Sequence, residues 1–192
     1  EANDIDIATA NGQKVVWNYK NVNLQASNNL DITGEVYHES GTTNLSGVNT
    51  TVNGDVKTVG SGTVNVDGVN TIINGNVYAK GNNSEISING GSSSTINGTV
   101  KTEKSNTINL GGKVINIDAK GGLGVNAVTS YYAPGAYSII NLGDKDTSEV
   151  NIKNATYGIL SQYNGSKIDI TTDKLNITDT SLYAGIDSPA YS

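Results

Sequence analysis

The sequence predicts an all-β protein built as a right-handed parallel β-helix, in which each coil of the chain lies on the coil before it. Three observations lead to this prediction. A short phrase recurs at a nearly constant step, apolar residues alternate with polar ones around each copy, and no segment carries apolar residues at a helical period. The spacing of the copies predicts coils of about 20–34 residues.

The first recurring phrase is centred on a glycine. It reads TTVNGDVKT at 50–58, TIINGNVYA at 71–79 and STINGTVKT at 94–102, with a weaker copy, LDITGEVYH, at 30–38. A β-branched residue stands two places before each glycine and a valine stands two places after it. This alternation predicts a strand with one buried face, repeated at a step of about 21 residues. The predicted buried positions are Ile32, Val36, Val52, Val56, Ile73, Val77, Ile96 and Val100.

A second strand series alternates with the first. It reads TNLSG at 43–47, VNVDG at 64–68, ISING at 86–90 and INLGG at 108–112, and each copy ends in glycine, where the chain must turn. Each period is therefore expected to hold two short strands. An antiparallel sandwich would show no such identity at a fixed period. The predicted inward positions of this series are Leu45, Val66, Ile88 and Leu110.

In the second half of the sequence the strand repeat continues but its spacing becomes less regular. We divide the chain into an N-terminal capping or boundary segment (1–29), regular β-helix coils (30–120), and coils with longer loops that continue beyond the sequence (121–192). Trp17 is expected to seal the first coil. The later strands are VINIDA, SIINLGD, EVNIKNA, KIDITTD and KLNITD, and the phrases that begin at Gly124, Tyr157 and Tyr183 join them.

Composition excludes several classes of function. The net charge is −6 and the basic residues are scattered lysines, which argues against nucleic acid as a partner. Cysteine is absent, so disulfides and cysteine chemistry are excluded. No apolar run reaches the length of a membrane-spanning helix, so we expect no membrane contact by this segment. His38 has no recognisable serine or cysteine partner and is expected at the surface.

The strands, the coil length and the Gly/Asn/Ser/Thr-rich composition resemble the passenger domains of Gram-negative autotransporter adhesins. The resemblance rests on stretches such as VNIKNATYGILS and covers roughly residues 30–192. It implies a secreted, non-enzymatic adhesin or stalk at the bacterial cell surface, anchored to the outer membrane through a region outside this sequence. The implied partner is a host or bacterial cell-surface glycan or protein, and self-association is left open.

Other β-solenoids share the same features, so two alternatives remain. One is a polysaccharide-degrading enzyme of the tailspike kind, and the other is a pure spacer stalk. A glycosidase needs two carboxylates across a groove, and the best local sets are Asp144 with Asp146 and Asp169 with Asp173. Both sets lie among lysines at strand ends, which favours a solvated charged turn. We therefore predict no catalytic residues.

No cofactor and no metal site is predicted. The nonapeptide calcium motif is absent, and GDKDTSE at 143–149 lacks the spacing of an EF-hand loop. Incidental calcium at Asp144, Asp146 and Glu149 is left open.

Tyrosine carries the binding prediction. Most of the ten tyrosines follow residue 130, and SYYAPGAYS at 130–138 interrupts the strand pattern. A tyrosine ring is apolar with a polar tip, so a cluster in a Gly/Pro loop must pack or bind. Tyr157 and Tyr183 recur in the same phrase and are assigned to packing. The residues predicted to bind the ligand are Tyr131, Tyr132, Tyr137 and Tyr163.

Overall fold

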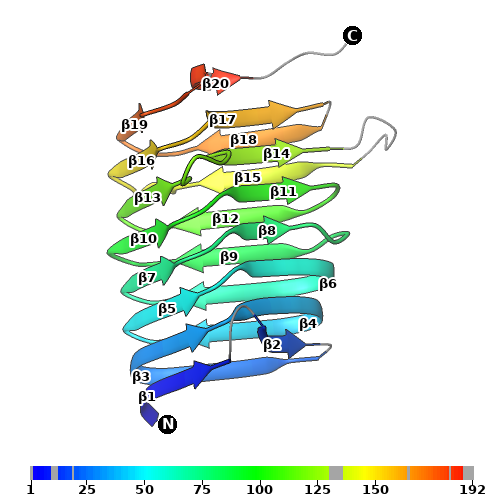
Figure 1. Cartoon of the computed structure of the whole chain (residues 1–192), viewed down its shortest axis with the longest axis vertical. Helices are drawn as coiled ribbons and strands as arrows, with labels where there is room; N and C mark the ends of the chain where they lie inside the picture. Colours follow the sequence, from blue (N-terminus) through cyan, green and yellow to red (C-terminus); the bar gives the residue numbers. More distant parts are fainter. Residues whose placement is uncertain are drawn as a thin grey trace.

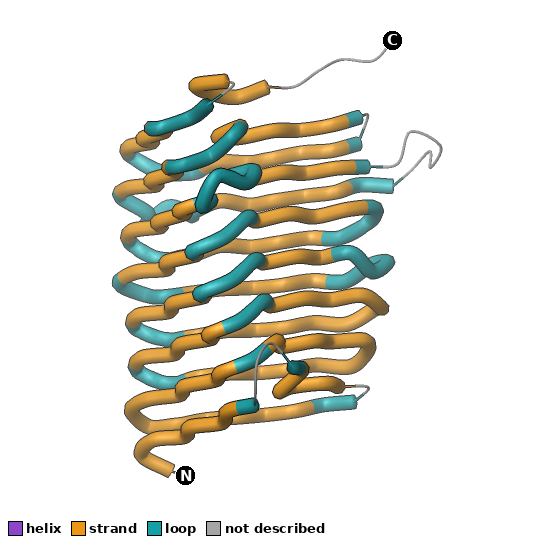
Figure 2. The backbone as a smooth tube through the Cα atoms, viewed as in Figure 1, coloured by secondary structure: helices purple, strands orange, loops and turns teal. Residues whose placement is uncertain are grey.

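The chain forms a parallel β-solenoid of about seven turns (Figure 1). A computed structural model describes residues 2–9, 13–18, 20–129, 136–163, 165–181 and 183–187, with 16–18 and 183–187 described by their backbone alone. These residues form 20 strands and no helix, and every pairing between neighbouring coils is parallel. In Figure 2 the strands stack in register, and loops occupy many of the corners between them, while β4 (Glu35–Ser46) and β6 (Val56–Asp67) continue round a corner as strands. The predicted all-β solenoid is confirmed.

The stacked coils present three faces. In the early coils one long strand covers two of these faces, as β6 does, and from β7 (Asn70–Ile73) onward each face has a strand of its own. Face 1 consists of β1 (Ala2–Ala8), the end of β3 (Val22–Thr33), β5 (Asn49–Asn53), β7, β10 (Ser93–Ile96), β13 (Val114–Asp118), β16 (Glu149–Lys153) and β19 (Lys174–Thr178).

Faces 2 and 3 follow face 1 in each coil. Face 2 consists of β2 (Lys14–Asn18), the beginnings of β4 and β6, β8 (Val77–Ala79), β11 (Val100–Glu103), β14 (Val125–Val128), β17 (Tyr157–Gln162) and β20 (Tyr183–Asp187). Face 3 consists of the beginning of β3, the ends of β4 and β6, β9 (Glu85–Asn89), β12 (Thr107–Gly111), β15 (Ser138–Leu142) and β18 (Ser166–Ile170).

The expectation of two strands per coil holds for the coil of β5 and β6 and is wrong from β7 onward, where each coil contains three. The Asn-Gly phrase is not one strand but two short strands joined at a corner. Val52 lies near the end of β5 on face 1, and Val56 is the first residue of β6 on face 2. Gly54 lies at the corner between them. Both valines point inward, and they stand four positions apart, which is an even step, so the alternation continues across the corner. Glycine is required there, since a Cβ on Gly75 would lie 2.4 Å from the carbonyl oxygen of Gly54.

The predicted inward positions form the core and stack in the predicted register. Val52 lies over Ile32 and under Ile73 on face 1, and Val66 lies between Leu45 and Ile88 on face 3. Such residues are almost fully buried. The same register places Tyr157 against Tyr183, which confirms that their two phrases correspond.

Buried hydroxyls and amides occupy the corners and satisfy the backbone there. The Thr50 hydroxyl donates to the carbonyl of Asp67 at 2.7 Å, and the buried Asn106 amide donates to the carbonyl of Gly81 at 2.7 Å. His38 belongs to this interior. It is fully buried, and its ring bonds to the Thr43 hydroxyl at 3.1 Å and the Gly41 carbonyl at 3.0 Å. Its predicted surface position is therefore wrong.

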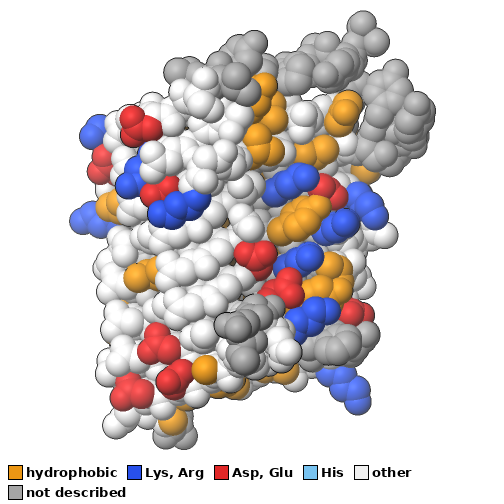
Figure 3. Space-filling model, in the orientation of Figure 1, with side chains coloured by type: hydrophobic (Ala, Val, Ile, Leu, Met, Phe, Trp, Pro, Cys, Tyr) orange, Lys and Arg blue, Asp and Glu red, His pale blue; other side chains and the backbone are white. Residues whose placement is uncertain are grey.

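Asparagine ladders cover much of the outside. On face 1 the Asn74 amide donates to Asn53 at 2.7 Å, and Asn97 continues the ladder with a bond of 2.7 Å to Asn74. On face 3 the Asn65 amide donates to Asn44 at 2.8 Å. In Figure 3 much of the visible surface is accordingly neutral and polar. Charged side chains lie toward both the left and the right edges, and those on the right lie beside hydrophobic side chains over β8 and β11. The repeated amides explain how so polar a chain holds its coils together.

Candidate functional site

Two of the four predicted tyrosines lie at one corner of the solenoid. Tyr137 precedes β15 and is 62% exposed, and Tyr163 follows β17 and is 36% exposed. Their coils are neighbours there, because the Ser138 amide donates to the carbonyl of Gly165 at 3.1 Å. Tyr131 and Tyr132 lie outside the described residues. The corner between faces 2 and 3 thus presents two exposed phenols on adjacent coils.

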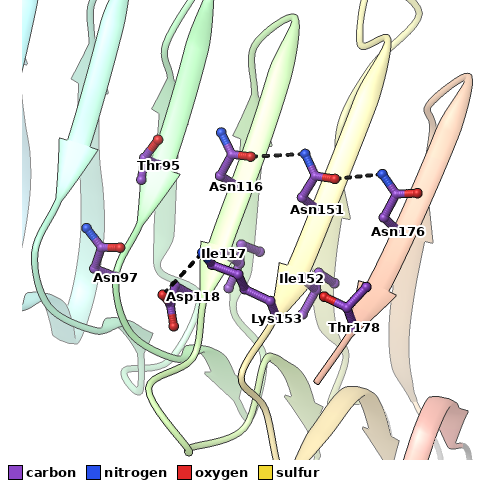
Figure 4. Close-up of a pocket in the computed structure, with 10 residues that line it drawn as sticks. All are labelled: Thr95, Asn97, Asn116, Ile117, Asp118, Asn151, Ile152, Lys153, Asn176 and Thr178. Carbon is purple, nitrogen blue, oxygen red and sulfur yellow. Dashed lines mark hydrogen bonds and ion pairs between the residues drawn. The ribbon is translucent and has the colours of Figure 1, made fainter. Parts of the chain in front are cut away.

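Face 1 carries a groove that the tyrosine prediction did not include. Its volume is about 490 Å³, and it runs across β10, β13, β16 and β19 between two outward columns of side chains (Figure 4). Backbone at Ile117 and Ile152 forms its floor. The residues that line it are Thr95, Asn97, Asn116, Ile117, Asp118, Asn151, Ile152, Lys153, Asn176 and Thr178.

A ladder of three asparagines forms one wall of the groove. Asn176 Nδ2 donates to Asn151 Oδ1 at 2.7 Å, and Asn151 Nδ2 donates to Asn116 Oδ1 at 3.0 Å. The amide groups therefore all point the same way along the solenoid. Among the described residues, the Nδ2 of Asn116 has no hydrogen-bond acceptor, and it lies at the end of the groove near Thr95 and Asn97. This end offers a free donor beside a hydroxyl and a second amide.

The other wall is charged. Asp118 accepts bonds from Asn154 Nδ2 at 3.0 Å and from the Lys120 backbone amide at 3.2 Å, and Lys120 Nζ lies 3.2 Å from its Oδ2. Lys153 Nζ lies 3.7 Å from the same oxygen. The bond from Asn154, followed by those from Lys120, lowers the pKa of Asp118 to about 2. The carboxylate is thus charged at neutral pH, and its side chain is only 13% exposed.

The sequence contains a signal for this groove, which the binding prediction based on tyrosines did not use. The pattern Asn-Ile followed by a polar residue occurs at 116–118, 151–153 and 176–178. Aligning the strands on it gives the register observed in the structure. The outward residues on either side of the buried isoleucine then fall into the two walls.

A second, smaller groove lies on face 3 and the following corner. It measures about 390 Å³ and contains two carboxylates, those of Asp67 and Asp144. Asp67, Asn89, Gly111 and Gly143 follow one another on successive coils. Because the two glycines have no side chains, they leave space for the groove. Desolvation raises the pKa of Asp67. Asp67 was absent from the carboxylate sets drawn from the sequence.

The carboxylates singled out from the sequence make local bonds. Asp144 Oδ1 accepts the backbone amide of Asp146 at 2.8 Å, as a turn-forming aspartate does, and Asp146 pairs with Lys145 at 2.6 Å. Asp169 pairs with Lys167 at 2.7 Å. Within the described part of the chain, no three His, Asp or Glu side chains are grouped so that they could hold a metal ion.

Face 2 carries an outward column in which tyrosine and lysine alternate. Tyr37, Lys57, Tyr78 and Lys101 follow one another on successive coils. Lys14 Nζ lies 3.3 Å from the centre of the Tyr37 ring, and Lys101 Nζ lies 5.3 Å from that of Tyr78. These cation–π contacts occupy the ring faces, so this column stabilises the stack and leaves little ring face for a ligand.

In comparisons with known proteins, no family model, no curated protein and no solved structure matches the chain. Within the described residues, no helix is long and apolar enough to cross a membrane. The function must therefore be argued from the groove and the exposed corner.

Proposed function

We propose that this chain is a non-enzymatic adhesin segment that binds a cell-surface glycan. It would belong to a secreted bacterial protein of the autotransporter type, in which the solenoid displays the binding surface away from the cell. The groove on face 1 is the principal binding site in this proposal. The corner with Tyr137 and Tyr163 is a second contact, on the opposite side of the coil from face 1.

The observation that carries the proposal is the wall of aligned amides in the groove. A sugar presents hydroxyls that both donate and accept hydrogen bonds, and asparagine side chains offer both functions. The wall is held rigid by its own ladder, so little side-chain entropy is lost when a ligand binds. At one end Asn116 offers its free Nδ2, and it lies beside Thr95 and Asn97, whose own Nδ2 is bonded to Asn74. A polysaccharide chain lying along the solenoid axis would meet the same chemistry at each coil.

Matched ladder variants test the site. Asn116→Ala removes the free amide of the groove together with the acceptor of one ladder bond. Asn44→Ala removes the acceptor of an equivalent ladder bond, of 2.8 Å, on face 3. Both should cost about 1 kcal/mol of stability or less, because the sites are partly exposed. Only Asn116→Ala should weaken binding on an array of cell-surface glycans, by roughly tenfold. Equal binding by both variants would show that the binding site is not in the groove.

The tyrosine corner is tested separately. Tyr137→Ala should lower adhesion to cells or glycans without lowering the melting temperature, since this ring is 62% exposed and contributes little to the core. Adhesion and stability lost together would assign the ring to packing. Failure of the unmodified chain to bind any glycan or cell surface would favour the spacer stalk.

One observation supports the enzymatic alternative. Asp67 and Asp144 share the groove on face 3, and the raised pKa of Asp67 is the property that a general acid needs. Among the described residues that line this groove, none is aromatic, so it lacks a platform for a sugar ring. Incubation with bacterial polysaccharides decides the matter. Chain shortening that Asp67→Asn abolishes would establish a hydrolase and overturn the non-enzymatic proposal.

A further inference from the structure

The charged wall of the face 1 groove is lined by one carboxylate, that of Asp118, and one ammonium group, that of Lys153. Two lysines, Lys120 and Lys153, share the single carboxylate of Asp118. Their side chains are 62% and 54% exposed, whereas the carboxylate is 13% exposed. A ligand in the groove therefore meets the ammonium group of Lys153 before it meets the Asp118 carboxylate. Glu149, on the same strand as Lys153, accepts a bond of 2.7 Å from Asn176 in the groove wall and is paired with Lys174 at 3.0 Å.

The acidic residues of the first coils lie too far away to change this local balance. Asp4, Asp6 and Asp31 are on face 1, but Asp31 is four coils from Asn116, which is about 20 Å at the spacing of parallel strands. Charges are screened over about 8 Å at physiological salt. The positive charge near the groove is therefore confined to Lys120 and Lys153 beside Asp118, because the exposed Asp179 follows the lining residue Thr178 on the neighbouring coil.

Lys153 is the cation that is free to change partner. Its Nζ lies 3.7 Å from Asp118 Oδ2, beyond the length of a hydrogen bond. Asp118 keeps shorter bonds from Asn154, at 3.0 Å, and from Lys120, at 3.2 Å. Lys153 can turn toward a ligand without leaving a carboxylate unpaired, so its reorientation carries little electrostatic cost. Figure 4 shows its side chain extending along the wall toward Asp118.

We propose that the groove selects acidic polysaccharides whose sugars carry carboxylates, with Lys153 pairing with a uronate while the asparagine wall binds the ring hydroxyls. This inference rests on the proposed function, because it names the class of glycan for the same groove. Carboxylate and ammonium form a charge-assisted hydrogen bond, which is stronger than the neutral bonds available to an uncharged sugar. Lys120 remains with Asp118 and holds the wall in place.

The test compares two hexasaccharides of matched length by calorimetry. One consists of galacturonic acid and the other of galactose. The acidic hexasaccharide should bind more tightly at low salt, and its advantage should fall as sodium chloride rises from about 50 to 500 mM, as screening predicts. Lys153→Gln should weaken binding of the acidic hexasaccharide by roughly three- to tenfold and leave the neutral one unchanged. Lys153→Arg should restore the preference.

Lys167→Gln is the matched control, because Lys167 forms an exposed ion pair of 2.7 Å with Asp169 on face 3 and lies outside the groove. It removes the same charge from the protein and should leave both affinities unchanged. Equal affinity for the two hexasaccharides, or equal losses in Lys153→Gln and Lys167→Gln, would overturn the uronate preference while leaving glycan binding intact. Binding of neither hexasaccharide would overturn the inference. If the glycan array also gave no ligand, the proposed function would fail with it.

Discussion

At the scale of single residues, the alternation of inward and outward positions determines which side chains are buried more strongly than residue type does. His38 stands two places after Val36, so it has the same inward parity, and it is buried on face 2. Polarity suggested the surface, but a solenoid corner needs buried hydrogen-bonding groups where the backbone leaves its ladder. The neighbouring coil has Thr58 at the corresponding position, which is also buried.

This position predicts acid sensitivity. Desolvation lowers the pKa of His38 below its value in the unfolded chain, and the bond to Gly41 opposes the shift only in part. The unfolded state then binds the proton more strongly. Stability is fully present above the unfolded pKa of about 6.5 and falls as the pH decreases through that value. The melting temperature should therefore drop between pH 7.5 and 5, a range above the ordinary titration of carboxylates.

His38→Gln supplies the comparison, because an amide can bond to Thr43 and Gly41 but does not titrate. Its melting temperature should change less over the same range. The same acid loss in both proteins would show that another group titrates.

At the scale of strands and corners, the sequence predicted the register well and the corners poorly. The columns through Val52 and Val66 could be read from the repeat because inward residues recur at a fixed step. The corner at Gly54 could not, because Val52 and Val56 keep the same parity across it. The groove, too, was predictable only where it depends on the repeat. Its asparagine wall was implicit in the Asn-Ile repeat, whereas the Lys120–Asp118–Lys153 arrangement depends on a turn that joins faces 1 and 2.

Corner glycines should tolerate no side chain. In Gly75→Ala, the new Cβ would lie 2.4 Å from backbone atoms of Gly54, and the backbone of the preceding coil cannot move aside locally. We expect a loss of about 1–3 kcal/mol in the free energy of unfolding, measured by denaturant titration. Gly111→Ala is the control, because the nearest atom to its Cβ would be the side-chain oxygen of Asn89 at 3.3 Å. If both variants lost equal stability, steric exclusion at the corner would not be the cause.

At the scale of the whole molecule, stability is distributed along a column rather than around a centre. Each coil packs mainly on the coils directly before and after it, so an array of this kind behaves as a chain of nearest-neighbour interactions. A binding site built from one wall across several coils is consequently sensitive to damage in any coil beneath it. The groove, which spans β10 to β19, should respond to disruption of those coils before it responds to disruption near β1.

Val66→Asp tests this distribution directly. Val66 is fully buried between Leu45 and Ile88, so a carboxylate there would be unpaired and should cost about 3–5 kcal/mol. Hydrogen exchange measured peptide by peptide should accelerate most in the coil of Val66 and the coils on either side of it. Asn65→Asp, on the outward side of the same strand, removes one ladder bond of 2.8 Å and should cost about 1 kcal/mol. Uniform acceleration over all coils in Val66→Asp would mean that the solenoid unfolds as a single cooperative unit, and equal losses in the two variants would contradict the assignment of Val66 to the interior.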